Sequence, residues 1–244
     1  MGVPTIGCDC AVCHSTDPHD RRTRPSVMVS YNGRQVLIDT TPDFREQALR
    51  EKITHLDAVL YTHTHADHLL GVDDLRPLSF AHKPGRLPLY ASADAGEFMR
   101  HMFRYIFEPN YKFGGLARVE LLPIDGPIEL FGARFEPVTV IHGETPILGF
   151  RFGSAAYLTD HSDVPSETLE KLRDLDILFL DALRHKPHPT HSTVEQSLKI
   201  VEEVKPKRAF FTHICHDLPH QATNAKLPPN VRLAHDGMKL EFEI

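Results

Sequence analysis

One short stretch constrains this chain more than any other. Three histidines and an aspartate fall within six residues, at His63, His65, Asp67 and His68, directly after an apolar run at residues 58–61. Such a run predicts a buried strand that delivers the next residues to an exposed edge. Side chains alternate along an extended segment, so His63 and His65 point the same way, and a turn into a helix at Asp67 brings Asp67 and His68 across the same cavity. The stretch therefore predicts two adjacent metal positions. The alternative is a histidine-rich loop in solvent, but such a loop would not require this regular spacing of ligands at the end of a strand.

Length and charge bound the class of protein. A chain of 244 residues can bury a large core without disulfides, and we expect a single domain over residues 1–244. The formal net charge is -6, so no global basic field recruits nucleic acid or an anionic membrane, and we expect neither as a partner. No stretch has the ~20 apolar residues of a membrane span, and signal-peptide blocks are missing, so we expect a cytoplasmic protein. A homodimer is compatible with the sequence, which does not settle the oligomeric state.

Cysteine usage is uneven along the chain. Cys8, Cys10 and Cys13 fall within six residues, whereas Cys215 lies about two hundred positions away. In a reducing cytosol this spacing suits a metal clip better than a disulfide framework, although inert or redox-active thiols remain the alternative. Three thiolates are one short of the tetrahedral set that structural zinc prefers, so a fourth ligand must come from elsewhere. His14 is the nearest candidate in the sequence.

Local patterns predict the main elements. An Asn-Gly pair at residues 32–33 tolerates the positive φ angles of a two-residue turn, so residues 26–39 predict a hairpin. Thr41 is a candidate N-cap for the helix that follows. Residues 93–107 predict one helix, and residues 116–122 predict a strand of a second sheet. The apolar face of that helix, expected to be core, comprises Phe98, Met99, Met102 and Ile106.

The pattern of an apolar run that ends in a histidine or a carboxylate recurs. Such runs precede His142, Asp160 and His213, at positions where parallel strands would end. Sheet-like and helical segments alternate twice along the chain, which predicts two similar halves. An αββα sandwich, in the α/β class with two packed mixed sheets flanked by helices, fits that order.

Seven residues in chain order resemble the ligand set of the metallo-β-lactamase superfamily, from about Val27 to the carboxyl terminus. They are His63, His65, Asp67, His68, His142, Asp160 and His213. The resemblance implies the sandwich fold and a dinuclear centre. One ion is then held by His63, His65 and His142, the other by Asp67, His68 and His213, and Asp160 bridges them. Imidazole and carboxylate donors suit Zn²⁺ and tolerate Mn²⁺, so we expect two zinc (or manganese) ions.

Three further segments are similar to a narrower family, the PhnP-type phosphoribosyl cyclic phosphodiesterases of the carbon–phosphorus lyase pathway. They are Gly2-Val3-Pro4 with the cysteine run that follows, Thr212-His213-Ile214-Cys215-His216, and Asp236-Gly237-Met238. This resemblance implies one structural zinc, with an N-terminal clip around residues 8–13. Its ligands are then Cys8, Cys10, Cys13 and His216, and the clip would pin the amino-terminal segment to the edge of the active site.

The segment His191-Ser192-Thr193 resembles the H-S-T segment of the tRNase Z branch. The resemblance implies that His191 contacts the scissile phosphate or helps the leaving oxygen depart. Without it, His191 reads as a residue of a helix-entry loop, with Ser192 or Thr193 as the cap. We expect Asp67 and His191 to be the catalytic residues, with Asp67 orienting the attacking water.

The resemblance implies a metal-dependent phosphoric diester hydrolase whose substrate is a small cyclic, nucleotide or sugar phosphodiester. One alternative is a tRNase Z-like endonuclease, which the acidic charge and the lack of an obvious RNA-docking arm disfavour. Another is a non-hydrolytic binding protein like the PqqB-like cofactor-biosynthesis proteins of the pyrroloquinoline quinone pathway. Two ions at the active site and turnover of a phosphodiester would favour the hydrolase, whereas clip zinc alone without turnover would favour the binding protein.

Overall fold

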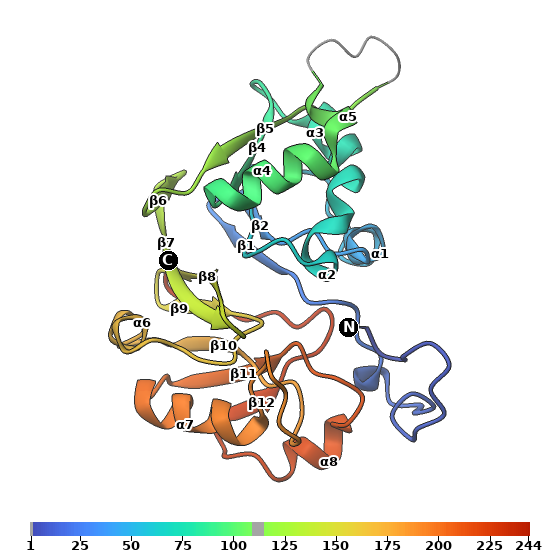
Figure 1. Ribbon diagram of the computed structural model, residues 1–244, viewed down its shortest axis with the longest axis vertical. Helices are drawn as coiled ribbons and strands as arrows, with labels where there is room; N and C mark the ends of the chain where they lie inside the picture. The colour runs from blue at the N-terminus through green and yellow to red at the C-terminus, as the bar shows by residue number, and fades with distance from the viewer. Residues whose placement is uncertain (1, 109–114) are drawn as a thin grey trace. The chain divides into compact units, whose positions relative to one another are not determined.

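The computed structural model describes residues 2–108 and 115–244 (Figure 1). The chain divides into two compact units, each with its own sheet and its own hydrophobic core. The N-terminal sheet unit is Arg24–Pro127, and the C-terminal sheet unit is Met1–Thr23 together with Ile128–Ile244. Two mixed sheets flanked by helices confirm the predicted fold class.

The N-terminal sheet unit contains a five-stranded sheet of order β1-β2-β3-β4-β5, in which β1 and β2 are antiparallel and the other pairs are parallel. Its strands are β1 (Val27–Tyr31), β2 (Arg34–Ile38), β3 (Ala58–Leu60), β4 (Leu87–Ala91) and β5 (Val119–Pro123). The predicted hairpin is confirmed, with φ of 48° at Asn32 and 75° at Gly33. The assignment of residues 116–122 to the second sheet was wrong, because β5 pairs with β4. An apolar alternation shows that a strand has a buried face, but it does not specify the neighbouring strand.

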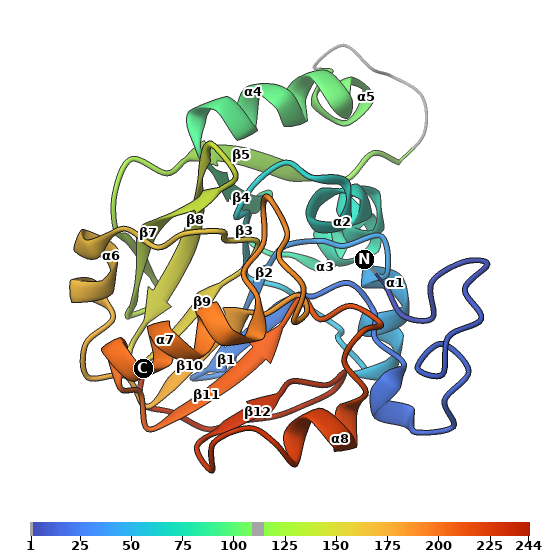
Figure 2. The ribbon, with the colours of Figure 1, turned by 60° about the horizontal axis from the view of Figure 1, so that its bottom comes forward.

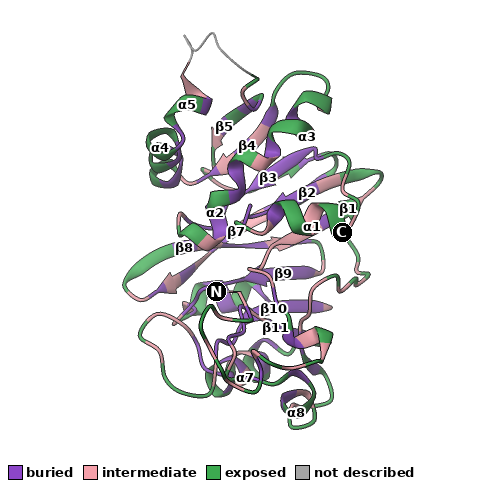
Figure 3. Ribbon diagram, turned by 90° about the vertical axis from the view of Figure 1, so that its right-hand side faces the viewer, coloured by how far each residue is buried: buried purple, intermediate pink, exposed green. Residues whose placement is uncertain are grey.

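Among residues 24–108 and 115–127, six short helices accompany this sheet. They are α1 (Phe44–Arg50), α2 (Ala66–Leu69), the 3₁₀ helix η2 (Leu70–Leu75), α3 (Arg76–Ala81), α4 (Ala93–Met102) and α5 (Arg104–Phe107). Thr41 is not the N-cap of α1, which is Asp43; instead the Thr41 hydroxyl accepts a hydrogen bond from the Asp43 amide at 3.0 Å. Figure 3 shows buried strands and exposed outer faces on the helices.

The single helix predicted over residues 93–107 is two helices that meet at Phe103. Met99 is buried as expected, but Phe98 is 40% exposed and Met102 is 47% exposed, so their assignment to the core was wrong. Helix α4 approaches the sheet through small residues. A Cβ placed on Gly96 would lie 3.4 Å from the Leu121 side chain of β5, and this close approach turns the larger side chains outward.

The C-terminal sheet unit contains a seven-stranded sheet of order β12-β11-β10-β9-β8-β7-β6. Its strands are β6 (Ile128–Leu130), β7 (Ala133–His142), β8 (Thr145–Phe152), β9 (Ala155–Leu158), β10 (Ile177–Asp181), β11 (Arg208–Thr212) and β12 (Val231–Leu233). Strands β9 to β12 pair in parallel, while β8 is antiparallel to both β7 and β9. The carboxyl ends of β7, β9, β10 and β11 therefore lie at one edge of the sheet.

Among residues 2–23 and 128–244, four helices belong to this unit. They are the 3₁₀ helix η1 (Pro18–Asp20), α6 (Ser166–Lys171), α7 (Val194–Val204) and α8 (His220–Asn224). Helix α7 lies along the sheet beside β10 and β11 (Figure 2), and buries Val194, Val201 and Val204 in the core. Thr193 caps it in a reciprocal capping box with Gln196. Within residues 2–108 and 115–244, no helix is both long and apolar enough to cross a membrane.

Candidate metal centre

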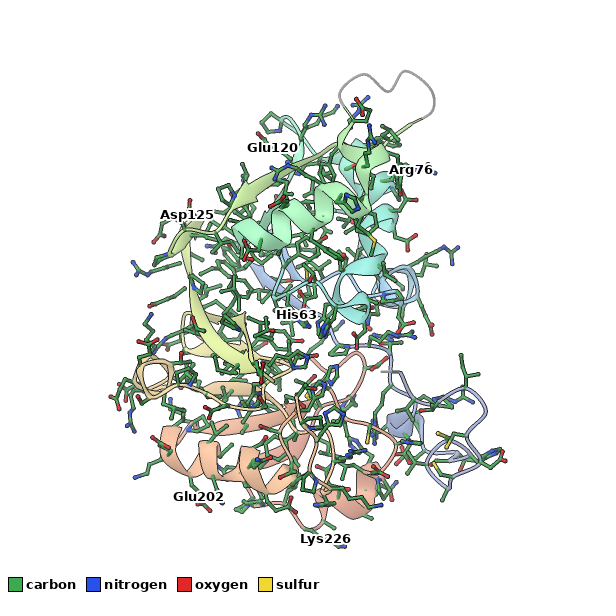
Figure 4. The ribbon with its side chains drawn as sticks, in the orientation of Figure 1. His63, Arg76, Glu120, Asp125, Glu202 and Lys226 are labelled. Carbon is green, nitrogen blue, oxygen red and sulfur yellow. The ribbon has the colours of Figure 1, made fainter. Side chains whose placement is uncertain are left out.

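The carboxyl end of β3 carries the histidine motif. His63 follows the strand and is labelled in Figure 4, His65 is the N-cap residue of α2, and Asp67 and His68 lie within that helix. The His63 ring lies 4.7 Å from that of His65 and 4.3 Å from that of His68, measured between centroids. Ligand atoms of Asp67 and His68 lie within 4.8 Å of each other. The strand end and the first turn of α2 thus gather the four predicted ligands of this unit.

A buried aspartate that the sequence analysis did not single out orients two of these imidazoles. Asp39 follows β2, which is parallel to β3, and its amide donates to the Leu60 carbonyl at 2.9 Å. Its carboxylate accepts hydrogen bonds from His68 Nδ1 at 2.8 Å and from the Thr62 hydroxyl at 2.8 Å. Because that hydroxyl donates to Asp39, it accepts from His63 Nδ1 at 3.0 Å. Both imidazoles therefore carry their proton on Nδ1, which puts the ligand lone pair on Nε2.

Four strand ends supply the polar groups of the C-terminal sheet unit. His142 ends β7, Asp160 follows β9, Asp181 ends β10 and His213 follows β11. Asp160 Oδ1 lies 3.4 Å from His213 Nε2. Ligand atoms of Asp160, Asp181 and His213, together with one from His191, all lie within 4.8 Å of one another. The shared direction of the strands therefore brings the three ligands predicted in this unit to one edge.

His142 is held in a ligand tautomer as well. Its Nδ1 donates to the Thr190 carbonyl at 2.7 Å, which leaves the lone pair on Nε2. Burial lowers the pKa of His142, while the Asp160 charge acts in the opposite direction. The net lowering favours the neutral imidazole, and only the neutral form can bind a metal ion.

His191 pairs with Asp181, a second aspartate that the sequence analysis did not single out. The distance from His191 Nδ1 to Asp181 Oδ2 is 2.7 Å, and the Asp181 side chain is fully buried. The His191 ring stacks on that of His213, with centroids 4.8 Å apart and planes at 11°. The carboxylate accepts a hydrogen bond from the Nδ1–H group, so it fixes the ring and directs Nε2 away from itself. The only signal for Asp181 in the sequence was an acidic residue at the end of an apolar run.

Three residues at these turns have a left-handed backbone. The φ angle is 65° at Asp39, 53° at Asp160 and 53° at His213. This conformation costs a residue other than glycine on the order of 1–3 kcal/mol, and it persists only where the surroundings hold it. At each position it turns the chain sharply out of a strand, so the functional side chain is placed immediately beyond the sheet edge.

The cysteine clip assembles within the C-terminal sheet unit. His216 Nδ1 lies 3.2 Å from Cys8 Sγ, 3.5 Å from Cys10 Sγ and 3.5 Å from Cys13 Sγ. Zn–S and Zn–N bonds of ~2.3 and ~2.0 Å in a tetrahedron separate sulfur from nitrogen by about 3.5 Å, so these four residues fit a zinc ion. The Cys13 amide hydrogen bond lowers the pKa of the Cys10 thiol to about 6, which favours the thiolate ligand.

His14, the nearest candidate in the sequence for the fourth position, does not join the clip. Its side chain is exposed and its Nε2 lies 3.4 Å from an Asp9 carboxylate oxygen. Proximity along the chain was therefore a poorer guide than the fold, which brings His216 to the thiols from more than two hundred residues away.

Residues 34–214 match the family described as a beta-lactamase superfamily domain. The crystal structure of a new diphosphatase from the PhnP family is 62% identical in sequence, covers 100% of this chain and 93% of that chain, and superposes with a TM-score of 0.95. Zn²⁺-bound PqqB from Methylobacterium extorquens is 19% identical in sequence, covers 99% of this chain and 96% of that chain, and has a TM-score of 0.79. At this identity the similarity shows a shared fold and nothing more.

A protein of Porphyromonas gingivalis (strain ATCC BAA-308 / W83) named octanoyltransferase is 38% identical to this chain over 243 residues. The alignment covers 98% of this chain but 49% of that protein, so the chain spans about half the length of this relative.

Proposed function

Because the chain belongs to the metallo-β-lactamase superfamily and, within it, to the PhnP family, we propose that it is a two-metal hydrolase of small phosphodiesters. The proposed substrates are cyclic or small nucleotide and sugar phosphodiesters. Because the chain is similar to a diphosphatase, we extend the proposed substrates to compounds with a diphosphate bridge. The observation that carries the proposal is the 2.7 Å pair of His191 and Asp181, which stands beside Asp160 and His213.

The donor set supports a metal-dependent reaction. The histidines whose Nδ1 is held by Asp39, Thr62 or Thr190 present Nε2 as a ligand, as metal-binding imidazoles do. When bound, two zinc (or manganese) ions polarise the phosphoryl oxygens and lower the pKa of water toward ~7. The proposed ligands are His63, His65 and His142 for one ion, Asp67, His68 and His213 for the other, and Asp160 for both.

The chain's own side chains supply the proton transfers. His191 donates the proton on Nε2 to the leaving oxygen, while Asp181 holds the proton on Nδ1 and stabilises the charged ring before transfer. Asp67 accepts a hydrogen bond from the attacking water and so orients it. Stacking on His213 keeps the His191 ring from rotating away from the phosphate.

The leaving group provides a test of this role. With zinc or manganese supplied, His191→Ala should lower kcat by about 10²–10⁴-fold for diesters that release a sugar or nucleoside alkoxide. The loss should be much smaller for bis(p-nitrophenyl) phosphate, because nitrophenolate departs without protonation. His185→Ala is the matched control, since His185 lies on the same loop but is exposed and pairs with Glu195 at 2.6 Å. Equal losses on both kinds of substrate would refute a proton-donating role for His191.

The same assays separate the competing functions. We would assay the protein on a panel of cyclic and linear phosphodiesters, a diphosphate-linked dinucleotide and a precursor tRNA. An octanoyl thioester in the same panel tests the activity named for the P. gingivalis relative. A wild-type protein that binds two active-site ions and cleaves neither the small phosphodiesters nor the diphosphate-linked dinucleotide would overturn the proposed function. Clip zinc alone, without turnover, would identify a binding protein of the kind that PqqB-like proteins suggest.

A further inference from the structure

The amino-terminal segment is joined to the loop at residues 213–218 by a second set of contacts that involves no metal. Arg22 is 7% exposed, and its guanidinium donates to the carbonyl oxygens of Cys215 at 2.8 Å and Leu218 at 2.6 Å. It also donates to Asp20 Oδ1 at 3.0 Å and to the His19 carbonyl at 3.2 Å. The contacts to Cys215 and Leu218 join residues that are almost two hundred positions apart in the sequence.

The position of Arg22 in the chain links it to the clip on both sides. Its backbone forms a two-way bridge with Val3, with both hydrogen bonds at 2.8 Å, so it is fixed beside the segment that leads into the clip cysteines. On the other side, Cys215 and Leu218 bracket His216, the fourth clip residue. Two residues before Cys215 stands His213, a proposed active-site ligand.

The chain just after the loop contacts Asp20, the partner of Arg22. Asp20 Oδ1 accepts a hydrogen bond from the His220 amide at 2.8 Å, just beyond the loop. Burial lowers the pKa of Arg22, and the Asp20 carboxylate acts against that lowering. A buried ion pair is a poor source of net stability, because desolvation offsets the attraction between the charges. The planar guanidinium does, however, fix several acceptors in one geometry, which a lysine cannot do.

We propose that Arg22 is a positioning residue that holds the loop at residues 213–218 so that His216 reaches the clip thiolates. The inference rests on zinc binding at the clip (Cys8, Cys10, Cys13 and His216) and is independent of the proposed phosphodiesterase activity. Arg22 then acts as an outer hydrogen-bond partner of a metal site. It orients the ligand His216 by binding the backbone carbonyls of Cys215 and Leu218, one on each side of that residue.

The test is the zinc affinity of the clip, measured by competition with a chromogenic chelator. Arg22→Met should weaken the clip for Zn²⁺ by about 10–100-fold, the usual effect of losing an outer partner. Arg22→Lys should weaken zinc binding less than Arg22→Met does. Asp20→Asn, which keeps the guanidinium, should also cause a smaller loss of zinc affinity. Arg151→Met is the matched control, because Arg151 also donates to backbone carbonyls of the same unit, at Lys171 and Arg173, but these hydrogen bonds are exposed to solvent.

Cobalt gives a readout that a general loss of stability does not change. With Co²⁺ in the clip, Arg22→Met should keep the thiolate charge-transfer bands and alter the d–d bands, which report the displaced His216. Wild-type affinity and spectrum in Arg22→Met would overturn the role of Arg22 while leaving the clip intact. An equal loss of affinity in Arg151→Met would also overturn it, because the effect would then be general. A wild-type clip that binds no zinc would overturn the clip and this role together.

Discussion

Asp39→Asn should weaken metal binding although Asp39 is not itself one of the proposed metal ligands. The Asp39 carboxylate is fully buried and accepts three hydrogen bonds, from the Thr62 amide at 2.9 Å, the Thr62 hydroxyl at 2.8 Å and His68 Nδ1 at 2.8 Å. Asparagine has the same shape and tolerates the left-handed backbone found here, where φ is 65°. The substitution therefore changes hydrogen bonding and charge alone.

No orientation of the amide reproduces the three contacts. If its NH₂ faces His68, the imidazole must accept on Nδ1 and carry its proton on Nε2, which removes the ligand lone pair. If the amide is flipped, its NH₂ meets the Thr62 amide, and two donors face each other in a buried site. We expect a 10–100-fold fall in metal affinity, which corresponds to about 1.4–2.7 kcal/mol. Unfolding should become easier by about 1–3 kcal/mol, because a buried group loses its partner.

Metal content after equilibration with a competing chelator measures the effect, alongside urea unfolding of the metal-depleted protein. Asp57→Asn is the matched control. Asp57 is also buried and accepts from Arg34 at 2.9 Å and from the Gln35 amide at 2.8 Å, but it precedes β3, at the other end of the strand. The Asp57→Asn variant should be less stable than the wild type but should bind its metals with unchanged affinity. Wild-type metal affinity in Asp39→Asn would refute the argument that Asp39 sets the tautomer of His68.

Two further predictions concern stability. A Cβ on Gly71 would overlap the Thr41 carbonyl oxygen, so Gly71→Ala should destabilise the protein by about 1–3 kcal/mol in urea unfolding. Gly126→Ala, where no atom lies within 4 Å, should change stability by less than about 0.5 kcal/mol, and equal effects would contradict the steric argument. Burial, reinforced by the charge of His19, lowers the pKa of His220 to about 4, below an unfolded value near 6.5. The unfolded state then binds more protons, so stability falls as the pH decreases from about 6.5 to about 4. His220→Gln should reduce that fall between about pH 7 and pH 4.5, and an unchanged fall would show that His220 does not cause it.

Several elements follow from local signals that act within a few residues. The Asn-Gly turn requires positive φ at both positions, so the hairpin of β1 and β2 was predictable. The apolar runs before His142, Asp160 and His213 are strands whose carboxyl ends meet at one edge. Residue type and chain order led to the family, which the sequence match over residues 34–214 bears out. The assignment of each ligand to a particular ion stays a prediction.

Other features depend on which distant segments lie together. Strand β5 joined the first sheet, because its apolar pattern fits either sheet and only pairing with β4 decides between them. Phe98 and Met102 are exposed because α4 approaches β5 through Gly96, a contact that no local periodicity encodes.

The sequence by itself identified the candidate metal ligands of this protein, because histidines and carboxylates after apolar runs and thiols in a short run are recognisable from residue type and spacing alone. Only the tertiary structure decided which groups hold them in place. Asp39, Asp181 and Arg22 look like ordinary charged residues in the sequence, and each acquires its role from a partner brought to it by the fold. The physical reason is that a ligand's identity is local, whereas its tautomer and orientation are set by hydrogen bonds to residues distant in the chain.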